Sequence, residues 1–313
     1  MKVLVTGVGG QLGHDVMNEL AKRGHEGIGS GLAPTYSGAA DGTAVTTMPY
    51  IRMDITDKIS VDEIISREEP DAVIHCAAWT AVDMAEEEDK IERVRMVNAA
   101  GTENISLACK KIGCKMLYLS TDYVFDGEGS SPWEPDCKDY NPLNVYGETK
   151  LEGELAVANN VEKHFIVRTA WVFGVNGKNF IRTMLNLGKT HDTISVVNDQ
   201  IGTLTYTYDL ARLLVDMIET EKYGYYHATN EGGYVSWYDI AEEIFRQAAE
   251  LGHTEYSPGR VEVRSVTTAQ YGASKARRPF NSRLDKSKLK ENGFEPLPDW
   301  KDALNRYLRE IEF

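Results

Sequence analysis

The segment Val3-Leu4-Val5-Thr6-Gly7-Val8-Gly9-Gly10-Gln11-Leu12-Gly13 decides the fold of this chain. It begins with a short apolar run containing β-branched residues, as expected of a strand buried in a parallel sheet. Leu12, Val16 and Leu20 then recur every four residues, which predicts a helix that ends near Gly24. A glycine turn between strand and helix lets the backbone approach a pyrophosphate, which the helix start then holds. Gly7, Gly10 and Gly13 therefore predict a dinucleotide site; the alternative is a purely structural turn.

The composition is that of an ordinary globular protein. The chain has 313 residues, 42% hydrophobic and 26% charged, enough for one large domain or two unequal ones. Its net charge of −14 argues against nucleic acids and anionic membranes as partners, because both repel an acidic surface. No apolar run is long enough to span a membrane and the N-terminus does not read as a signal peptide, so we expect a cytoplasmic protein. The four cysteines and seven histidines have no metal-ligand spacing, and no metal site is predicted.

A second pattern lies in the middle of the chain, within residues 144–154. Tyr146 and Lys150 are four residues apart, so on a helix their side chains are neighbours on one face. A tyrosine hydroxyl has a reference pKa of roughly 10, and an ammonium beside it is expected to lower that pKa toward neutrality. Such a pair can donate a proton to a carbonyl that receives a hydride. The same spacing also occurs by chance on amphipathic helices.

Strands and helices alternate between these two patterns. Apolar runs at 50–53, 71–76 and 115–120 predict strands, and residues 87–113 predict one long helix. Residues 31–49 are rich in Gly, Ala, Ser, Thr and Pro, which predicts a loop inserted between the second and third strands. The alternation predicts an α/β fold, a Rossmann-type doubly wound parallel sheet.

Thr121 lies where the strand at 115–120 ends. Open α/β sheets bind their ligands at the carboxyl ends of their strands. We therefore expect Thr121 to hydrogen-bond a substrate oxygen together with Tyr146.

The last third of the chain is less regular. Residues 179–190 and 206–221 predict helices, and residues 261–266 alternate like a strand. We expect a Rossmann domain over residues 1–170 and a smaller C-terminal α/β substrate domain over residues 171–313. Some segments of the second part can return to the first domain.

One basic cluster stands out near the C-terminus of this acidic chain. It contains Lys275, Arg277, Arg278 and Arg283. Arginine geometry suits a diphosphate, so the cluster could clamp one. The alternative is a run of solvated surface charges.

The spacing G-x-x-G-x-x-G resembles the short-chain dehydrogenase/reductase superfamily, whose extended members carry a Tyr-x-x-x-Lys pair where Tyr146 and Lys150 lie. Longer segments resemble the dTDP-4-dehydrorhamnose reductase family within it. These segments are Ala77–Asp83, Ser120–Gly127, Pro142–Lys150, Arg168–Phe173, Asn198–Gly202, Trp237–Tyr238, Arg278–Leu284 and Pro298–Trp300.

The resemblance implies NAD(P)H-dependent reduction of the C4 keto group of dTDP-4-dehydro-L-rhamnose, a step of cell-surface polysaccharide biosynthesis. It implies that Tyr146 donates the proton, that Lys150 lowers the pKa of Tyr146 and holds the nicotinamide ribose, and that Thr121 assists. The implied cofactor contacts are Gly7, Gly10, Gln11, Leu12, Gly13, Ser30, Asp54, Ile55, Ala77, Ala78, Trp79, Thr80, Asn98, Tyr146 and Lys150. The implied substrate contacts are Thr121, Asp122, Trp171 and Arg278.

The chain departs from related families at two places. Sugar-nucleotide dehydratases of the superfamily read Thr-Asp-Glu where this chain has Thr121-Asp122-Tyr123, so the general base for elimination is missing and a reductase is favoured. Members often carry an acid at the tip of the second strand, where this chain has Gly29-Ser30-Gly31. Without a carboxylate to repel a 2′-phosphate, we expect NADPH, with NADH as the alternative. Asp41, in the inserted loop, cannot be placed from the sequence.

Two rival functions stay open. One is a reductase of another nucleotide-linked 4-keto sugar, because the nucleobase pocket cannot be read from sequence. The other is a non-catalytic dinucleotide-binding protein, like the regulatory subunit of methionine adenosyltransferase that resembles this family. The intact Thr121, Tyr146 and Lys150 argue against that role. A homodimer and a requirement for Mg²⁺ are also left open.

Overall fold

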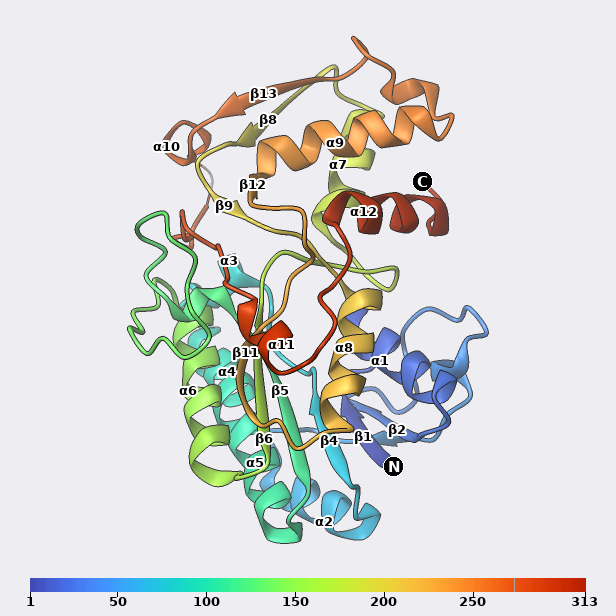
Figure 1. Ribbon diagram of the computed structural model, residues 1–313, viewed down its shortest axis with the longest axis vertical. Coiled ribbons are helices and arrows are strands. Elements are labelled where there is room, and N and C mark those ends of the chain that lie inside the picture. The colour runs from blue at the N-terminus through green and yellow to red at the C-terminus, as the bar shows by residue number, and fades with distance from the viewer. Residues whose placement is uncertain (273) are drawn as a thin grey trace.

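Seven parallel strands form the central sheet, in the order β11-β6-β5-β4-β1-β2-β3 (Figure 1). This holds for residues 1–272 and 274–313, which the computed structural model describes. The strands are β1 (Lys2–Thr6), β2 (Glu26–Gly31), β3 (Tyr50–Arg52), β4 (Ala72–His75), β5 (Lys115–Thr121), β6 (His164–Thr169) and β11 (Gly224–His227). The chain first moves outward from β1 to β3 and then in the opposite direction from β4. The strand order therefore reverses between β1 and β4, which makes their carboxyl ends the expected ligand crevice.

Helices cover both faces of the sheet (Figure 1). One face carries α1 (Gln11–Lys22) and α8 (Thr207–Ile218), and the other carries α2 (Lys58–Glu68), α5 (Gly101–Ile112) and α6 (Val145–Asn160). Successive side chains of a strand point to opposite faces, so Val3 and Val5 join the core under α1 and α8, whereas Leu4 joins the core on the other face. The predicted doubly wound parallel sheet is confirmed.

A smaller unit follows residue 170 (Figure 1). Its three two-stranded sheets are β7 (Val172–Phe173) with β10 (Thr205–Tyr206), β8 (Thr193–Val197) with β13 (Glu262–Val266), and β9 (Ile201–Gly202) with β12 (Val235–Ser236). Its main helices are α7 (Phe180–Gly188), α9 (Trp237–Glu250) and α12 (Trp300–Glu310), which share one apolar core. The intervening α8 and β11 return to the large sheet. Shorter helices are α3 (Val82–Ala85), α10 (Thr268–Tyr271) and α11 (Ser287–Glu291).

The long helix predicted over residues 87–113 is formed without a break over residues 91–112, but it is not α-helical throughout. It consists of α4 (Ile91–Arg95), a π-helical turn (Met96–Ala100) and α5, which follow one another directly. Asn98 lies buried in this turn, where its side chain accepts a hydrogen bond of 2.8 Å from the Trp79 N–H. Its amide nitrogen donates to the Thr149 hydroxyl at 3.1 Å. The π turn is accompanied by these tertiary hydrogen bonds, which hydrophobic periodicity in the sequence cannot predict. Such π turns often lie near functional sites.

Side chains from several elements fasten the inserted loop, which follows β2 and contains a 3₁₀ turn (Ala44–Thr46). His14 lies between two carboxylates, with Nδ1 2.9 Å from Asp15 and Nε2 2.8 Å from Asp41. Asn176, from the smaller unit, accepts a hydrogen bond of 3.0 Å from the Ala39 N–H. Asp41, which the sequence could not place, is thus held at α1.

We predict that the loop makes stability depend on pH through His14. Burial disfavours charged His14, but the hydrogen bonds and charges of Asp15 and Asp41 outweigh it and raise the pKa of His14. A histidine whose pKa is higher in the folded state than in the unfolded state stabilises the fold while it is protonated. This stabilisation is fully present below the unfolded-state pKa, about 6.5, and is lost as pH rises through the folded-state pKa. In urea unfolding, the advantage of wild type over His14→Gln should therefore shrink between about pH 6 and about pH 8.5.

The exposed His191 provides the matched control, because its replacement by glutamine should leave the pH dependence unchanged. An advantage over His14→Gln that is equal at both pH values would contradict a charged His14 between the two acids.

Candidate active site

A cleft of about 940 Å³ opens at the carboxyl ends of the parallel strands. Its lining comes from the ends of β1, β2 and β5, from the segments that follow β3, β4 and β6, and from the smaller unit. Most predicted site residues line it: Gly7, Gly10, Gln11, Leu12, Gly13, Ser30, Asp54, Ile55, Ala77, Ala78, Thr80, Thr121, Asp122, Tyr146, Lys150 and Trp171. The fold thus brings together residues that are up to 164 positions apart in sequence, counted from Gly7 to Trp171 (171 − 7).

The glycine turn has no room for side chains at two of its positions. Gly7 has a φ of +72°, and a Cβ there would lie 2.8 Å from the backbone of Ala77. A Cβ on Gly13 would lie 2.5 Å from the carbonyl oxygen of Gly7. The N-cap of α1 is Gly10, with no side-chain cap and no acid in the first turn. The first N–H groups of the helix are therefore left for an anion, and the turn fits the pyrophosphate of a dinucleotide.

Tyr146 is the second residue of α6, a helix that begins because the Asn144 side chain accepts a hydrogen bond of 2.8 Å from the Gly147 N–H. The ring of Tyr123 meets that of Tyr146 edge-on, with centroids 5.6 Å apart. Burial raises the pKa of Tyr146 to about 12, although a hydrogen bond with Thr121 opposes the rise. Tyr146 therefore keeps its proton at neutral pH.

Lys150 is buried one turn further along α6, with 3% of its surface exposed. Its ammonium donates a 2.6 Å hydrogen bond to the Leu119 carbonyl and lies 4.0 Å from the ring centroid of Tyr118. Burial lowers the pKa of Lys150 to about 7, against the opposing charge of Glu154. The pKa of Tyr146 is therefore not lowered toward neutrality as expected, because burial disfavours the charged forms of both Tyr146 and Lys150.

A buried ion pair between Glu154 and Arg168 lies one helical turn beyond Lys150 on α6. Glu154 accepts two hydrogen bonds from Arg168, at 2.9 Å from Nε and 2.8 Å from Nη2, and neither side chain is exposed to solvent. Arg168 also donates to the carbonyl of Pro135 and the hydroxyl of Tyr140. Because Arg168 lies in β6, the pair ties α6 to the sheet.

Thr121 and Asp122 form a polar wall of the cleft. The Thr121 hydroxyl donates to Asp122 Oδ1 at 3.0 Å and accepts from the Tyr123 N–H at 3.2 Å. Burial raises the pKa of Asp122 to about 6, and its second oxygen has no hydrogen-bond partner among the described residues. Burial also raises the pKa of Tyr123 well above its usual value.

Three predicted site residues do not line the cleft. Trp79 belongs to the loop that follows β4, and the buried Asn98 holds its main chain through two hydrogen bonds. Arg278 forms an ion pair of 2.7 Å with Asp83 instead of facing the cleft. Another member of the basic cluster, Lys275, pairs with Glu87 at 2.8 Å, so part of the cluster is neutralised by the protein itself.

Several lining residues come from the smaller unit and were not predicted. They are Val172, Asn176, Gly177, Lys178 and Trp237. Trp237 stacks on Trp171, with ring centroids 4.0 Å apart, and Trp171 has a left-handed backbone with φ of +51°. Such a conformation is strained for a large residue and is typical of functional sites. Only the family resemblance at Trp237–Tyr238 could have pointed to Trp237.

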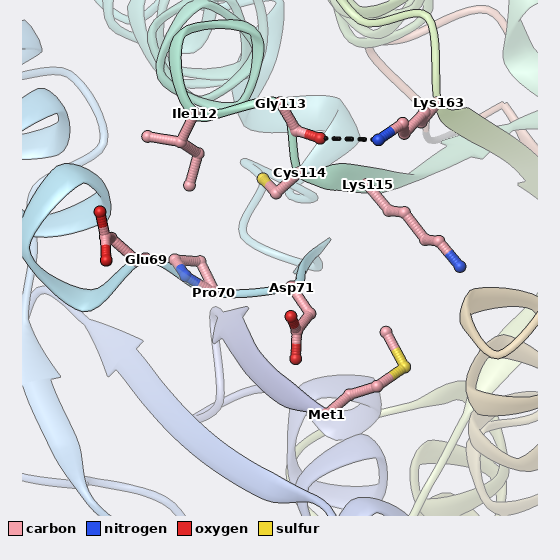
Figure 2. Close-up of a pocket in the computed structure, with 9 residues that line it drawn as sticks. All are labelled: Met1, Glu69, Pro70, Asp71, Ile112, Gly113, Cys114, Lys115 and Lys163. Carbon is pink, nitrogen blue, oxygen red and sulfur yellow. Dashed lines mark hydrogen bonds between the residues drawn. The ribbon is translucent and has the colours of Figure 1, made fainter.

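A second cavity, about 620 Å³, lies at the amino ends of the strands (Figure 2). Three of its charged side chains have partners within the protein: Asp71 accepts from the Lys2 N–H, and Lys115 donates to the Ile218 carbonyl. Lys163 donates to the Gly113 carbonyl, the dashed line in Figure 2. No predicted site residue lines this cavity. The cleft at the carboxyl ends is therefore the candidate active site.

Residues 1–272 and 274–313 contain neither a metal-ligand cluster nor a membrane-spanning helix. None of these residues form a group of three or more His, Cys, Asp or Glu side chains arranged to hold a metal ion. No helix in this part of the chain is long and apolar enough to cross a membrane.

The chain has the features of an extended short-chain dehydrogenase/reductase. These are the reversed strand order, the glycine turn between β1 and α1, and the Tyr–Lys pair in the same cleft as Thr121. The sequence profile described as RmlD substrate binding domain matches residues 1–313. The chain belongs to this RmlD family.

Individual relatives agree with this assignment. A dTDP-4-dehydrorhamnose reductase of Streptomyces griseus is 39% identical over 307 residues, covering 96% of this chain and 91% of the relative. The crystal structure of a dTDP-4-dehydrorhamnose reductase from Clostridium acetobutylicum is 36% identical, with a TM-score of 0.84 over 100% of both chains. The dTDP-4-dehydrorhamnose reductase of Bacillus anthracis, solved in complex with NADP, is 34% identical, with a TM-score of 0.83 over 99% of both chains.

We predict that Gly13→Ala weakens dinucleotide binding at least tenfold. The added Cβ would meet the backbone of Gly7 and Val8 and push α1 away from the turn, at a cost of about 1–3 kcal/mol. Gly9→Ala is the control, because its Cβ would meet only the Ser37 hydroxyl, at 3.3 Å. Calorimetric titration with NADPH and thermal melting measure both effects. Equal affinity in wild type and Gly13→Ala would contradict the assignment of the turn.

Proposed function

We propose that this protein reduces the C4 keto group of dTDP-4-dehydro-L-rhamnose to give dTDP-L-rhamnose, with NADPH or NADH as the reductant. The product would serve cell-surface polysaccharide synthesis. The observation that carries the proposal is the cluster of Thr121, Tyr146 and Lys150 in a cleft of about 940 Å³ at the switch point of the sheet. Relatives with 34–39% identity bear the name dTDP-4-dehydrorhamnose reductase, which supports the substrate.

The residues of the cluster suit carbonyl reduction. The bound dinucleotide supplies a hydride to the carbonyl carbon, and the ketone oxygen then needs one proton to become an alcohol. Tyr146, whose pKa of about 12 keeps it protonated, donates that proton. The Thr121 hydroxyl holds the same oxygen in place. The ammonium of Lys150, buried beside the pocket, stabilises the phenolate left behind and holds the ribose.

The same residues do not suit elimination of water. A dehydratase needs a base at C5 and an acid at C6 of the sugar, beside the Tyr–Lys pair. In Thr121-Asp122-Tyr123 only one carboxylate is present, and burial raises the pKa of Tyr123 away from the range of a base. Reduction is therefore favoured over dehydration at this site.

The experiment that tests the proposed function compares substrates. NADPH oxidation is followed with dTDP-4-dehydrorhamnose and with 4-keto-6-deoxy sugars linked to UDP and GDP. We expect the dTDP sugar to have the highest kcat/KM. Faster turnover of a UDP- or GDP-linked sugar would favour the rival reductase. Dinucleotide binding without turnover of any of these sugars would favour a non-catalytic role.

We predict that Tyr146→Phe lowers kcat by roughly 10²-fold or more, because it removes the proton donor. The affinity for NADPH should stay nearly unchanged, since the pyrophosphate and adenine contacts are elsewhere in the cleft. Tyr123→Phe is the matched control, because it removes a neighbouring hydroxyl with no proposed role in reduction. A Tyr146→Phe variant with near-wild-type turnover would overturn the proposed role.

We also predict a preference for NADPH over NADH. The Ser30 hydroxyl near the end of β2 is buried and has no hydrogen-bond partner among the described residues. Arg52 lies beside it, because it pairs with Gly31 across β2 and β3. Two carboxylates lie in this region, but both have partners within the protein. Asp41 bonds to His14, and Asp54 accepts hydrogen bonds from the Thr56 hydroxyl and N–H. Hydroxyl and guanidinium groups both suit a 2′-phosphate.

Ser30→Asp should therefore shift kcat/KM toward NADH by repelling the 2′-phosphate, whereas Ser30→Ala, which adds no charge, should change the ratio much less. A wild-type kcat/KM that is higher with NADH than with NADPH would refute the preference.

A further inference from the structure

We propose that Lys178, a residue of the smaller unit, supplies the counter-charge for the pyrophosphate of the bound dinucleotide. The inference rests on the dinucleotide-binding part of the proposed function and assigns a role to a residue that lies about 165 positions beyond the glycine turn, counted from Gly13 (178 − 13). It makes the smaller unit part of the cofactor site.

The main chain that carries Lys178 is fixed against the glycine turn. The side chain of Gln11 accepts hydrogen bonds from the Gly174 N–H at 2.8 Å and from the Asn179 amide at 3.1 Å. The amide nitrogen of Asn176 donates to the carbonyl oxygens of Gly9 at 3.1 Å and Gly10 at 3.2 Å. These bonds hold both sides of the 174–179 segment beside the start of α1, where the pyrophosphate is expected.

Gly177 turns the segment toward the cleft. Its φ is +116°, a conformation that other residues rarely adopt, and a Cβ on it would lie 3.4 Å from Cγ of Gln11. The turn therefore passes close to the residue that begins α1. Lys178 follows directly, lines the cleft and is exposed. Its ammonium has no hydrogen bond or ion pair with any described residue, so it is available to a ligand.

The balance of charge in the cleft also points to Lys178. Among the residues that line it, only Lys150 and Lys178 are cationic, and the ammonium of Lys150 is held by the Leu119 carbonyl at the catalytic end. A pyrophosphate carries two negative charges, and the partial charge of a helix start offsets only part of them. Lys178 lies within the 174–179 segment, which Gln11 and Asn176 hold at the glycine turn. A lysine binds phosphate well as a point charge.

The test measures binding rather than turnover. NADPH, NADH and dTDP are each titrated calorimetrically into wild type, Lys178→Met, Lys178→Arg and the control Lys189→Met, which removes an exposed lysine just after α7. We expect Lys178→Met to lower the affinities for NADPH and for NADH by the same factor, roughly tenfold at low salt. The loss should shrink in about 1 M salt, where the Debye length is about 3 Å.

The other variants complete the expectation. Lys178→Arg should bind both dinucleotides nearly as wild type does, Lys189→Met should match wild type throughout, and dTDP affinity should not change in any variant.

Three results would overturn the proposal. Loss of NADPH affinity alone would place Lys178 at the 2′-phosphate, and loss of dTDP affinity would place it at the substrate diphosphate. Unchanged affinity for both dinucleotides would mean that Lys178 contacts neither. A protein that loses dinucleotide affinity as expected in Lys178→Met but reduces no nucleotide sugar would overturn the proposed function and leave this inference standing.

Discussion

The ammonium of Lys150 donates a 2.6 Å hydrogen bond to the carbonyl of Leu119 and lies 4.0 Å from the ring centroid of Tyr118. Both partners belong to β5, the strand that ends in Thr121. The Tyr118 hydroxyl in turn donates to the Lys150 carbonyl at 3.2 Å. These contacts lock the start of α6 to the end of β5 and so place Tyr146 beside Thr121. A buried charge is unfavourable unless it is compensated, and the negative charge of Glu154 on the same helix offsets only part of this cost, so the pKa of Lys150 is still lowered to about 7.

The burial that fixes this geometry also decides where the proton resides. Burial lowers the pKa of Lys150 to about 7 and raises that of Tyr146 to about 12. The pocket thus keeps the tyrosine protonated at neutral pH, as the proposed proton donor must be. At the other end of the cleft the smaller unit is tied to the glycine turn through Gln11 and Asn176. The glycine turn and the smaller unit are therefore held together by direct hydrogen bonds.

Features set by local spacing were predictable from the sequence, and features set by distant partners were not. The glycine turn, the Tyr–Lys pair and the parallel sheet follow from residues a few positions apart. Asp41 could not be placed because its partner, His14, lies 27 residues away in sequence. Arg278 was expected at the substrate, but its guanidinium pairs with Asp83, 195 residues earlier. The π turn was missed for the same reason, and Lys178 follows a turn that no pattern in the sequence links to the cleft.

Hydride transfer to C4 of the sugar is the central claim, and isotope transfer tests it most directly. NADPH carrying deuterium at both positions of nicotinamide C4 is incubated with the enzyme and dTDP-4-dehydrorhamnose, and the product is analysed by NMR and mass spectrometry. We expect dTDP-rhamnose with one deuterium, at C4 of the sugar. A product that carries hydrogen at C4, or deuterium at any other carbon, would contradict the arrangement of Tyr146, Lys150 and Thr121 as a carbonyl-reducing site.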